Sequence, residues 1–299
     1  MDFGIALPTY PAGATIEGVV KVAQAAERLG FKSAWTTDHV IMPADQAGPY
    51  GEIFEPLMIL AYLAAVTEKV ELGISVIVVP QRNGIVLAKQ LATLDHLCQG
   101  RLLVGVGAGW NEREFAMLDA ADRFHRRGAY LDETIHVWRH LWTSPEQSFD
   151  GEFYHLADVA FGPAPFTAGG PAVWVGGSSL AARRRAGRLG SAWHPVGISA
   201  ADLADQFVAV REAAETARQP IPTAVARLPM RFSVGGGPMN ANRNIQVLEG
   251  EPAQVAERLM EYRAAGAAEI ICHFGSPDGD EVVENMEIFS REVMPVFNS

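Results

Sequence analysis

The chain has 299 residues, of which 48% are hydrophobic, and it carries a formal charge of −11 at pH 7. Its length and apolar content allow one large buried core, and nothing in it is long and apolar enough to span a membrane. The negative charge argues against nonspecific binding to nucleic acid or to an anionic membrane, so any anion site in this chain requires a local concentration of cations.

The two cysteines, Cys98 and Cys272, lie in apolar stretches of a predicted helix and a predicted strand. Buried free thiols are therefore favoured over a disulfide or a catalytic nucleophile. The first residues start a strand and lack the basic and apolar pattern of a signal peptide. Together these features predict a reducing, cytoplasmic location.

Apolar runs and helical periodicities alternate along the chain. The eight predicted strands cover residues 3–7, 33–37, 74–79, 102–106, 172–175, 192–194, 227–234 and 269–274. Predicted helices cover residues 16–29, 126–142, 200–217, 252–265 and 281–293, and further helices open at Glu55-Pro56, around Leu87 to Leu97, and after Ser179.

The strands over 74–79 and 102–106 are apolar without alternation. This pattern is typical of parallel strands that are covered by helices on both faces. The strand-helix order and the length therefore predict a single (β/α)8 TIM barrel domain over residues 1–299. We expect a short insertion with an Asp-Gly hairpin at 148–155 between strands four and five, and a Gly- and Asn-rich loop at 235–246, a lid or substrate wall by composition, after strand seven.

In a barrel of this kind, the active site lies at the C-terminal ends of the strands. The residues predicted there are Asp38, His39, Ser75, Val76, Gly107, Ala108, Gly109, Trp110, Gly176, Gly177, Ser178, Ser179, His194 and His273. His39 is of the type that moves protons near neutral pH, but taken by itself the position favours a hydrogen-bonded structural histidine. No H-E-x-x-H or C-x-x-C spacing occurs, so no metal is expected.

Two features indicate a phosphate site. The turn from Gly176 to Ser179 leads from a strand into a helix, whose N-terminus offers free N–H groups. The arginines behind it form a local cationic cluster in an acidic chain, at positions 183, 184, 185 and 188. Taken alone, the same residues also fit a tight connection followed by a solvated helix face.

Several motifs together resemble the bacterial luciferase-like monooxygenase superfamily, most closely its branch that uses the deazaflavin coenzyme F420. They are Trp35-x-x-Asp38-His39, Gly73-Ile74-Ser75-Val76, Ala88-Lys89-Gln90, Gly105-Val106-Gly107-Ala108-Gly109-Trp110, Arg127-Gly128-x-x-Leu131-Asp132-Glu133 and Trp174-Val175-Gly176-Gly177-Ser178. The resemblance runs from residue 1 to about residue 195 and is weaker beyond.

The resemblance implies that the barrel mouth holds the ring of the cofactor, with its phosphate at Gly176, Gly177, Ser178 and Ser179 and backbone contacts from Gly107, Ala108 and Gly109. It implies a cis peptide at Ser75-Val76, a homodimer, and a small organic substrate. His39 would then handle the proton that accompanies hydride transfer, while Asp38 orients His39 or binds the ring.

At the position that matches Trp110, the resemblance implies a glutamate in the sugar-phosphate dehydrogenase of this group. Neither Glu112 nor Glu114 is assigned the proton-donating role of that glutamate. Trp110, His194 and His273 are expected as pocket residues. Two other functions remain open. One is an FMN-dependent monooxygenase that receives reduced flavin from a separate reductase, and the other is a flavin-binding barrel without turnover.

Overall fold

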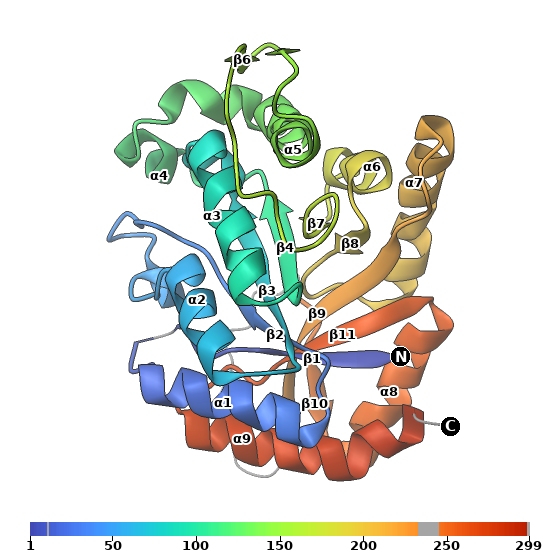
Figure 1. The fold of residues 1–299 in the computed structure, drawn as a ribbon. Coiled ribbons are helices and arrows are strands. Elements are labelled where there is room, and N and C mark those ends of the chain that lie inside the picture. The colour runs from blue at the N-terminus through green and yellow to red at the C-terminus, as the bar shows by residue number, and fades with distance from the viewer. Residues whose placement is uncertain (11, 233–244, 298–299) are drawn as a thin grey trace.

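The computed structural model describes residues 1–10, 12–232 and 245–297. Eight of its strands pair in parallel in a closed ring, so the predicted (β/α)8 barrel is confirmed (Figure 1). The ring runs through β9 (Thr223–Phe232), β11 (Ala267–His273), β1 (Asp2–Ala6), β2 (Ser33–Thr36), β3 (Glu71–Val78), β4 (Leu102–Gly107), β7 (Ala172–Gly176) and β8 (Ala192–His194), which pairs with β9 again.

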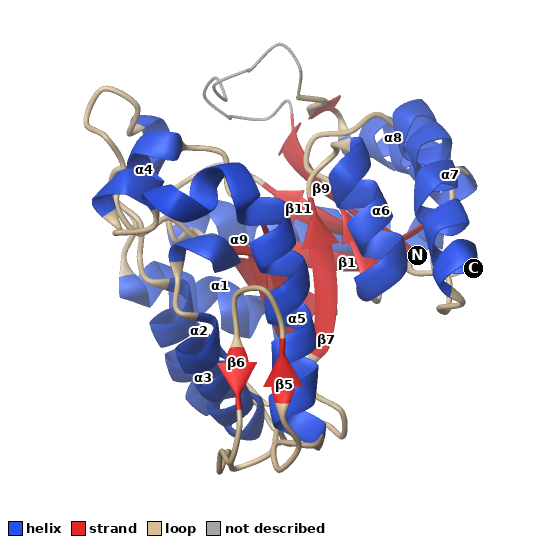
Figure 2. Ribbon diagram, turned by 90° about the horizontal axis from the view of Figure 1, so that it is seen from above, coloured by secondary structure: helices blue, strands red, loops and turns tan. Residues whose placement is uncertain are grey.

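Helices cover the outside of this ring (Figure 2). They are α1 (Ile16–Leu29), α2 (Pro56–Val66), α3 (Gly84–Leu97), α4 (Glu112–Met117), α5 (Arg127–Thr143), α6 (Leu180–Leu189), α7 (Ala200–Ala217), α8 (Pro252–Ala264) and α9 (Gly279–Ile288). Short 3₁₀ helices occur at η1 (Gly48–Tyr50), η2 (Val79–Gln81), η3 (Ala121–Arg126) and η5 (Met294–Phe297), and a π-helix at η4 (Phe289–Val293). Among the residues described, no helix has both the length and the apolarity to cross a membrane.

The ends of the helices follow from local sequence signals. Thr15 caps α1 by accepting a hydrogen bond from the Gly18 amide, and Gly30 ends it with a left-handed φ of 81°. Ser179 caps α6 in the same way through the Ala182 amide. Such caps satisfy backbone groups that a helix end leaves unpaired, which explains why the predicted bounds of α1 and α7 match the structure.

The insertion between β4 and β7 contains the predicted hairpin. Its two strands, β5 (Phe149–Asp150) and β6 (His155–Leu156), pair antiparallel, and the Gly151 amide donates to the Tyr154 carbonyl. The hairpin lies outside the barrel, next to α5 (Figure 2). It therefore leaves the mouth of the barrel open.

Two predicted elements differ from the structure. β9 begins at Thr223, four residues before the predicted strand, because its first residues pair with β8 and β11 although alanines there have weak β propensity. The predicted helix over 281–293 is divided into α9 and the π-helix η4. The end of the predicted seventh strand and most of the predicted lid, residues 235–244, lie outside the described residues. A short strand, β10 (Leu248–Gly250), pairs with the outer part of β9.

Two aromatic side chains pack inside the barrel. Trp35 and Trp174 pack with centroids 4.7 Å apart inside the ring, within a cluster separate from the main core between strands and helices. A Cβ atom at Gly73 would lie 2.3 Å from the Trp35 ring, so only glycine leaves room for this indole. The indole pair therefore fills part of the barrel interior and does not line the cavity described below.

Candidate active site

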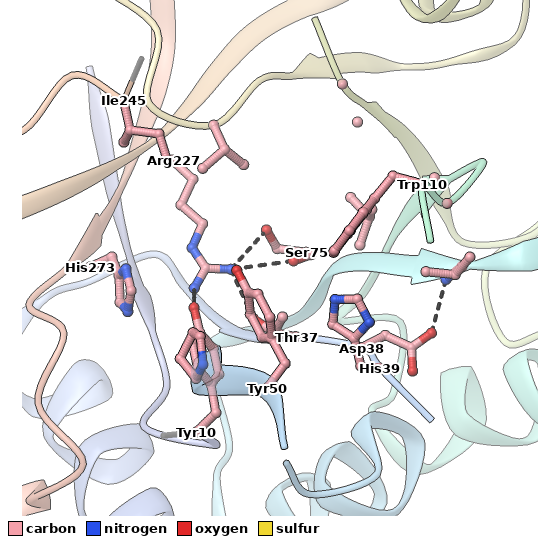
Figure 3. A pocket seen from close by; sticks show the side chains of 18 of the residues that line it. Tyr10, Thr37, Asp38, His39, Tyr50, Ser75, Trp110, Arg227, Ile245 and His273 are labelled. Atoms are coloured by element: carbon pink, nitrogen blue, oxygen red, sulfur yellow. Dashed lines mark hydrogen bonds between the residues drawn. The ribbon is translucent and has the colours of Figure 1, made fainter. Parts of the chain in front are cut away.

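A cavity of about 810 Å³ opens at the C-terminal ends of the barrel strands, where the sequence placed the site. It is large enough for a drug-sized ligand or a cofactor ring. Its lining contains the following predicted residues: Asp38, His39, Ser75, Val76, Gly107, Ala108, Gly109, Trp110, Gly176, Gly177, Ser179 and His273. Figure 3 shows the part of this lining around His39 and Arg227.

His39 is held by a carboxylate that the sequence analysis did not assign. Its Nδ1 lies 3.1 Å from Oε2 of Glu114, which is 1% exposed, and the Val40 amide donates to Oε1 of the same carboxylate at 3.1 Å. Burial opposes ionisation of Glu114, but its hydrogen bonds, chiefly from His39, outweigh burial and hold its pKa below the ordinary value. An ionised carboxylate accepts only, so Nδ1 of His39 carries the proton.

The other ring nitrogen of His39 is therefore available to a ligand. Among the described residues Nε2 has no hydrogen-bond partner, and the ring lines the cavity between Tyr50 and Trp110, with centroids 4.6 and 6.1 Å away. A neutral imidazole with Nδ1–H presents an acceptor at Nε2, and a protonated one presents a donor. This arrangement can take a proton from a substrate oxygen or return it.

Asp38 does not orient His39, and the prediction of that role is wrong. One Asp38 oxygen accepts from the Val78 amide at 2.9 Å and the other from Nη2 of Arg82 at 2.7 Å. Both bonds fasten the end of β2 to the end of β3. Asp38 still lines the cavity, so its other expected role, contact with the ring, stays a prediction.

A helix start could have revealed Glu114. Asn111 caps α4 with bonds from the amides of Arg113 and Glu114, and the Asn-x-x-Glu spacing is that of a helix N-terminus. The spacing places Glu114 in the first turn of a helix that follows the glycines of β4. The contact with His39, 75 residues away in sequence, is visible only in the tertiary structure.

His194 does not line the cavity, which corrects its assignment as a pocket residue. Its side chain is fully buried behind Ser75, with Nε2 2.7 Å from the Ser75 hydroxyl and Nδ1 3.2 Å from the Val225 carbonyl. The carbonyl can only accept, so Nδ1 donates to it and the serine hydroxyl donates to Nε2. Burial, with a contribution from Arg227, lowers the pKa of His194 to about 4. His194 is thus a neutral support for Ser75.

Ser75 and Val76 form a bulge that faces the cavity. The peptide bond between them is cis, as predicted, and the pairing of β3 with β4 shifts register between Ile74 and Ile77. Val76 points toward two strand-end glycines, because Cβ atoms at Gly107 and Gly176 would lie 2.6 and 2.7 Å from its methyl groups. These glycines therefore accommodate Val76, a role that the sequence analysis did not foresee.

The turn before α6 fits an anionic group. Gly177 has a φ of 101°, and an added Cβ there would meet only Ala182, at 3.3 Å, so the backbone is open to the cavity. The turn ends at the N-terminus of α6, which attracts negative charge. Ser178, which was predicted as part of the phosphate turn, is exposed and does not line the cavity.

The arginines behind this turn are not equivalent. Arg185 is buried in the cavity wall, where it bonds Asp132 and the Gly128 carbonyl, and Arg188 bonds the other Asp132 oxygen at 2.6 Å. Asp132 thus neutralises part of the cluster. Arg184 is exposed, and in the described part of the chain no carboxylate pairs with it.

The cavity also has a polar wall, of which the sequence analysis identified only His273. Arg227 on β9 and Tyr10 after β1 line the cavity together with His273 at the end of β11 (Figure 3). An isolated arginine in an apolar strand and a tyrosine beside prolines carry no motif, so no sequence signal identified Arg227 or Tyr10.

The chain was compared with known proteins. The sequence profile of luciferase-like monooxygenases matches residues 1–246. An uncharacterised protein of Mycobacterium tuberculosis is 34% identical over 177 residues, which cover 55% of this chain and 59% of that protein. The chain therefore spans less than two thirds of that relative.

The names of two further relatives state an activity. The F420-dependent glucose-6-phosphate dehydrogenase of Gordonia bronchialis is 32% identical over 76% of this chain and 67% of its own. The FMNH2-dependent dimethylsulfone monooxygenase of Pseudomonas putida is 27% identical over 92% of this chain and 86% of its own.

Solved structures share the fold at lower identity. The monooxygenase RslO1 of Streptomyces bottropensis has a TM-score of 0.83 and 23% identity, and covers 99% of this chain and 100% of its own. An F420-dependent secondary alcohol dehydrogenase has a TM-score of 0.83 and 17% identity, with coverage of 99% and 98%. The backbone is thus equally similar to both enzymes.

Proposed function

The chain belongs to the luciferase-like monooxygenase family, and on that basis we propose that it is an oxidoreductase that transfers a hydride between coenzyme F420 and a small carbonyl, alcohol or activated alkene. The observation that carries the proposal is the His39–Glu114 pair, whose free Nε2 faces a cavity large enough for a cofactor ring and a substrate. The relative in Gordonia bronchialis supports F420 as the cofactor.

The residues of the cavity fit such a cofactor. The open backbone at Gly177 and the N-terminus of α6 would hold its phosphate, and Gly107, Ala108 and Gly109 with the Ser75-Val76 bulge would border its ring. When bound, the deazaflavin supplies the carbon that gives or receives the hydride. Arg184, exposed on α6, is available to the acidic tail of F420, which FMN lacks.

The protein itself handles the proton that accompanies hydride transfer to a carbonyl. His39 delivers it from Nε2 to the substrate oxygen, and in the reverse direction accepts it from an alcohol. Glu114 holds the ring with Nε2 toward the cavity and stabilises the imidazolium form. The buried apolar cluster around Trp35 and Trp174 keeps water out of the barrel interior.

An FMN-dependent monooxygenase is the second candidate. The relative in Pseudomonas putida, which covers most of this chain, supports it. In that function a separate reductase supplies reduced flavin, and the same cavity holds the ring. A flavin-binding barrel without turnover is disfavoured because His39 lies in the cavity wall rather than away from it.

A homodimer remains part of the proposal. α2 is apolar around its whole circumference, yet Met58 and Tyr62 are 61% and 52% exposed, and Val86 on the adjacent α3 is also exposed. Such a patch on an outer helix is typical of a protein interface. A second copy of this chain is the expected partner.

Equilibrium titration with oxidised F420 and with FMN tests the cofactor, by quenching of the fluorescence of each. Micromolar or tighter affinity for F420 and much weaker affinity for FMN is the expected result, and it justifies a screen of carbonyls and alcohols by the absorbance of the deazaflavin. If only FMN binds, the FMN-dependent monooxygenase becomes the favoured function. If neither cofactor binds, the assignment of a cofactor site to Gly176 to Ser179 is wrong.

A further inference from the structure

Arg227 is a buried cation in the cavity wall without a counter-charge. It is 4% exposed, and none of the carboxylates in the described residues pairs with it. Removing an unpaired charge from water costs several kcal/mol. A chain with a net charge of −11 has acidic residues in excess. The lack of an acidic partner for Arg227 therefore indicates that its counter-charge comes from a ligand.

Neutral oxygens hold the guanidinium in place. Nη1 donates to the Thr37 hydroxyl at 2.9 Å and to Ser75 at 3.3 Å, and Nη2 donates to the Tyr10 hydroxyl at 2.7 Å (Figure 3). A guanidinium has five N–H donors in a planar fork. Nε and the second hydrogen of Nη2 find no acceptor among the residues described, so one edge of the fork is free.

Two other arginines near the cavity, the half-buried Arg82 and the buried Arg185, have carboxylate partners in the described residues. Arg82 bonds Asp38 at 2.7 Å and Glu55 at 3.2 Å, and the buried Arg185 bonds Asp132. These pairs serve structure, because both partners are held within the protein. Arg227 differs in that its free edge lies in the wall of the ligand cavity.

The neighbours of the free edge add no charge. His273 lines the same part of the cavity, where burial and the nearby Arg227 lower its pKa to about 3, so its imidazole is neutral. The ring of Tyr10 lies 5.8 Å from that of His273, and Arg227 lies 5.9 Å from the Tyr10 ring centroid. The guanidinium is therefore the local source of positive potential.

Tyr10 and His273, the neighbours of Arg227, lie on the side of the barrel opposite the phosphate turn. In the strand order of the closed ring, β11 and β1 lie opposite β4 and β7, which carry the glycines of the proposed cofactor site. His273 ends β11 and Tyr10 follows β1. Arg227 itself is on β9, two strands from β7, but its guanidinium donates to the Tyr10 hydroxyl, which lies on the side of the mouth opposite the cofactor phosphate.

We propose that Arg227, with the Tyr10 hydroxyl beside it, binds a carboxylate of the substrate. The substrate of the proposed hydride transfer is then a small organic anion rather than a neutral compound, an inference that rests on the proposed function. The planar fork of a guanidinium matches a carboxylate with two parallel hydrogen bonds. In a site of low dielectric, such bonds distinguish a charged ligand from its neutral isostere.

The test measures binding of benzoate and of benzamide, its neutral isostere, to the cofactor-free protein by calorimetry. We expect benzoate to bind about ten to a hundred times more tightly than benzamide, as hydrogen bonds between charged groups imply. Arg227→Met should reduce this ratio to about one. Arg211→Met, which removes an exposed charge on α7, should leave the ratio unchanged.

Arg227→Lys serves if the methionine variant does not fold, since it keeps the charge but loses the fork and should weaken the preference. Equal or undetectable binding of the two probes by the wild type, or an unchanged preference in the Arg227 variants, overturns the inference. So does a loss of F420 affinity in Arg227→Met with the benzoate preference kept, because Arg227 would then bind the ring.

The same preparations are titrated with F420 and FMN, which separates this inference from the proposed function. If a cofactor binds but benzoate is not preferred, only the proposed carboxylate site is refuted. If benzoate is preferred in a manner that depends on Arg227 but neither cofactor binds, the proposed function is refuted and the anion site is supported.

Discussion

At the scale of single residues, the orientation of His39 depends on one buried carboxylate. Glu114→Gln keeps an acceptor for Nδ1 but removes the charge that stabilises the imidazolium form of His39. We expect kcat to fall about tenfold with KM unchanged, and His39→Ala to lower kcat by about 10² to 10⁴, the range of general acid–base catalysis. Both variants are compared with the wild type by single-turnover oxidation of the reduced deazaflavin with the best substrate of the screen.

Glu112→Gln is the matched control, because Glu112 lies on the same short helix but is exposed. It should behave as the wild type. A Glu114→Gln enzyme with the wild-type rate, or one in which KM alone changes, would show that the carboxylate does not act through His39.

A second buried carboxylate, Glu269 in β11, makes stability depend on pH. It is 2% exposed and bonds the Ser33 hydroxyl, and burial raises its pKa to about 7. Between the ordinary pKa of 4.5 and about 7, the folded state binds more protons at this group than the unfolded state does. Its contribution to the free energy of unfolding therefore decreases as pH rises through this window, by about 3 kcal/mol in total.

Glu269→Gln removes this titration, so the variant should gain stability over the wild type as the pH rises from 5 to 8. Urea unfolding at several pH values measures the difference. The depressed pKa values of His194 and His273 have the opposite effect, since stability falls as pH falls below 6.5, but both histidines are present in wild type and variant alike. If the free energies of unfolding of the two proteins differed by the same amount at every pH, the prediction would be contradicted.

At the scale of elements, three strands meet at the side chain of Val76. A methyl group at Gly107 would lie 2.6 Å from Val76, closer than real contacts allow, so we expect Gly107→Ala to lower the free energy of unfolding by about 1 to 3 kcal/mol. Val76→Ala removes the obstructing methyl groups. The double variant should therefore be more stable than the sum of the single effects predicts, in a double-mutant cycle of urea unfolding. Additive effects would show that Gly107 serves another purpose.

At the scale of the whole molecule, the exposed apolar side chains of α2 lead us to expect a dimer that forms through this helix. A carboxylate at Met58 would be solvated in a monomer but buried without a partner in a dimer, so Met58→Glu should shift a dimer toward monomer without unfolding it. Sedimentation velocity of the wild type and variant measures this, with Val208→Glu on the exposed face of α7 as the control. A monomeric wild type would refute the proposed dimer.

The sequence by itself determined the barrel, most strand and helix ends, and the position of the cavity. These features follow from local patterns: unbroken apolar runs at β3 and β4, capping residues such as Thr15 and Ser179, and glycines where strands end. Because parallel strands place all their C-terminal ends on one face, strand-end residues such as His39 could be assigned to one site before the fold was known.

Only the tertiary structure decided which of these residues act together. Glu114 contacts His39 across 75 positions, Arg227 reaches Ser75 across 152, and His194 lies behind Ser75 instead of beside the ligand. Periodicity predicts which face of an element is buried, but the partner of a polar side chain depends on packing between distant elements. The charge environment of the site therefore followed from the closed ring and not from any motif.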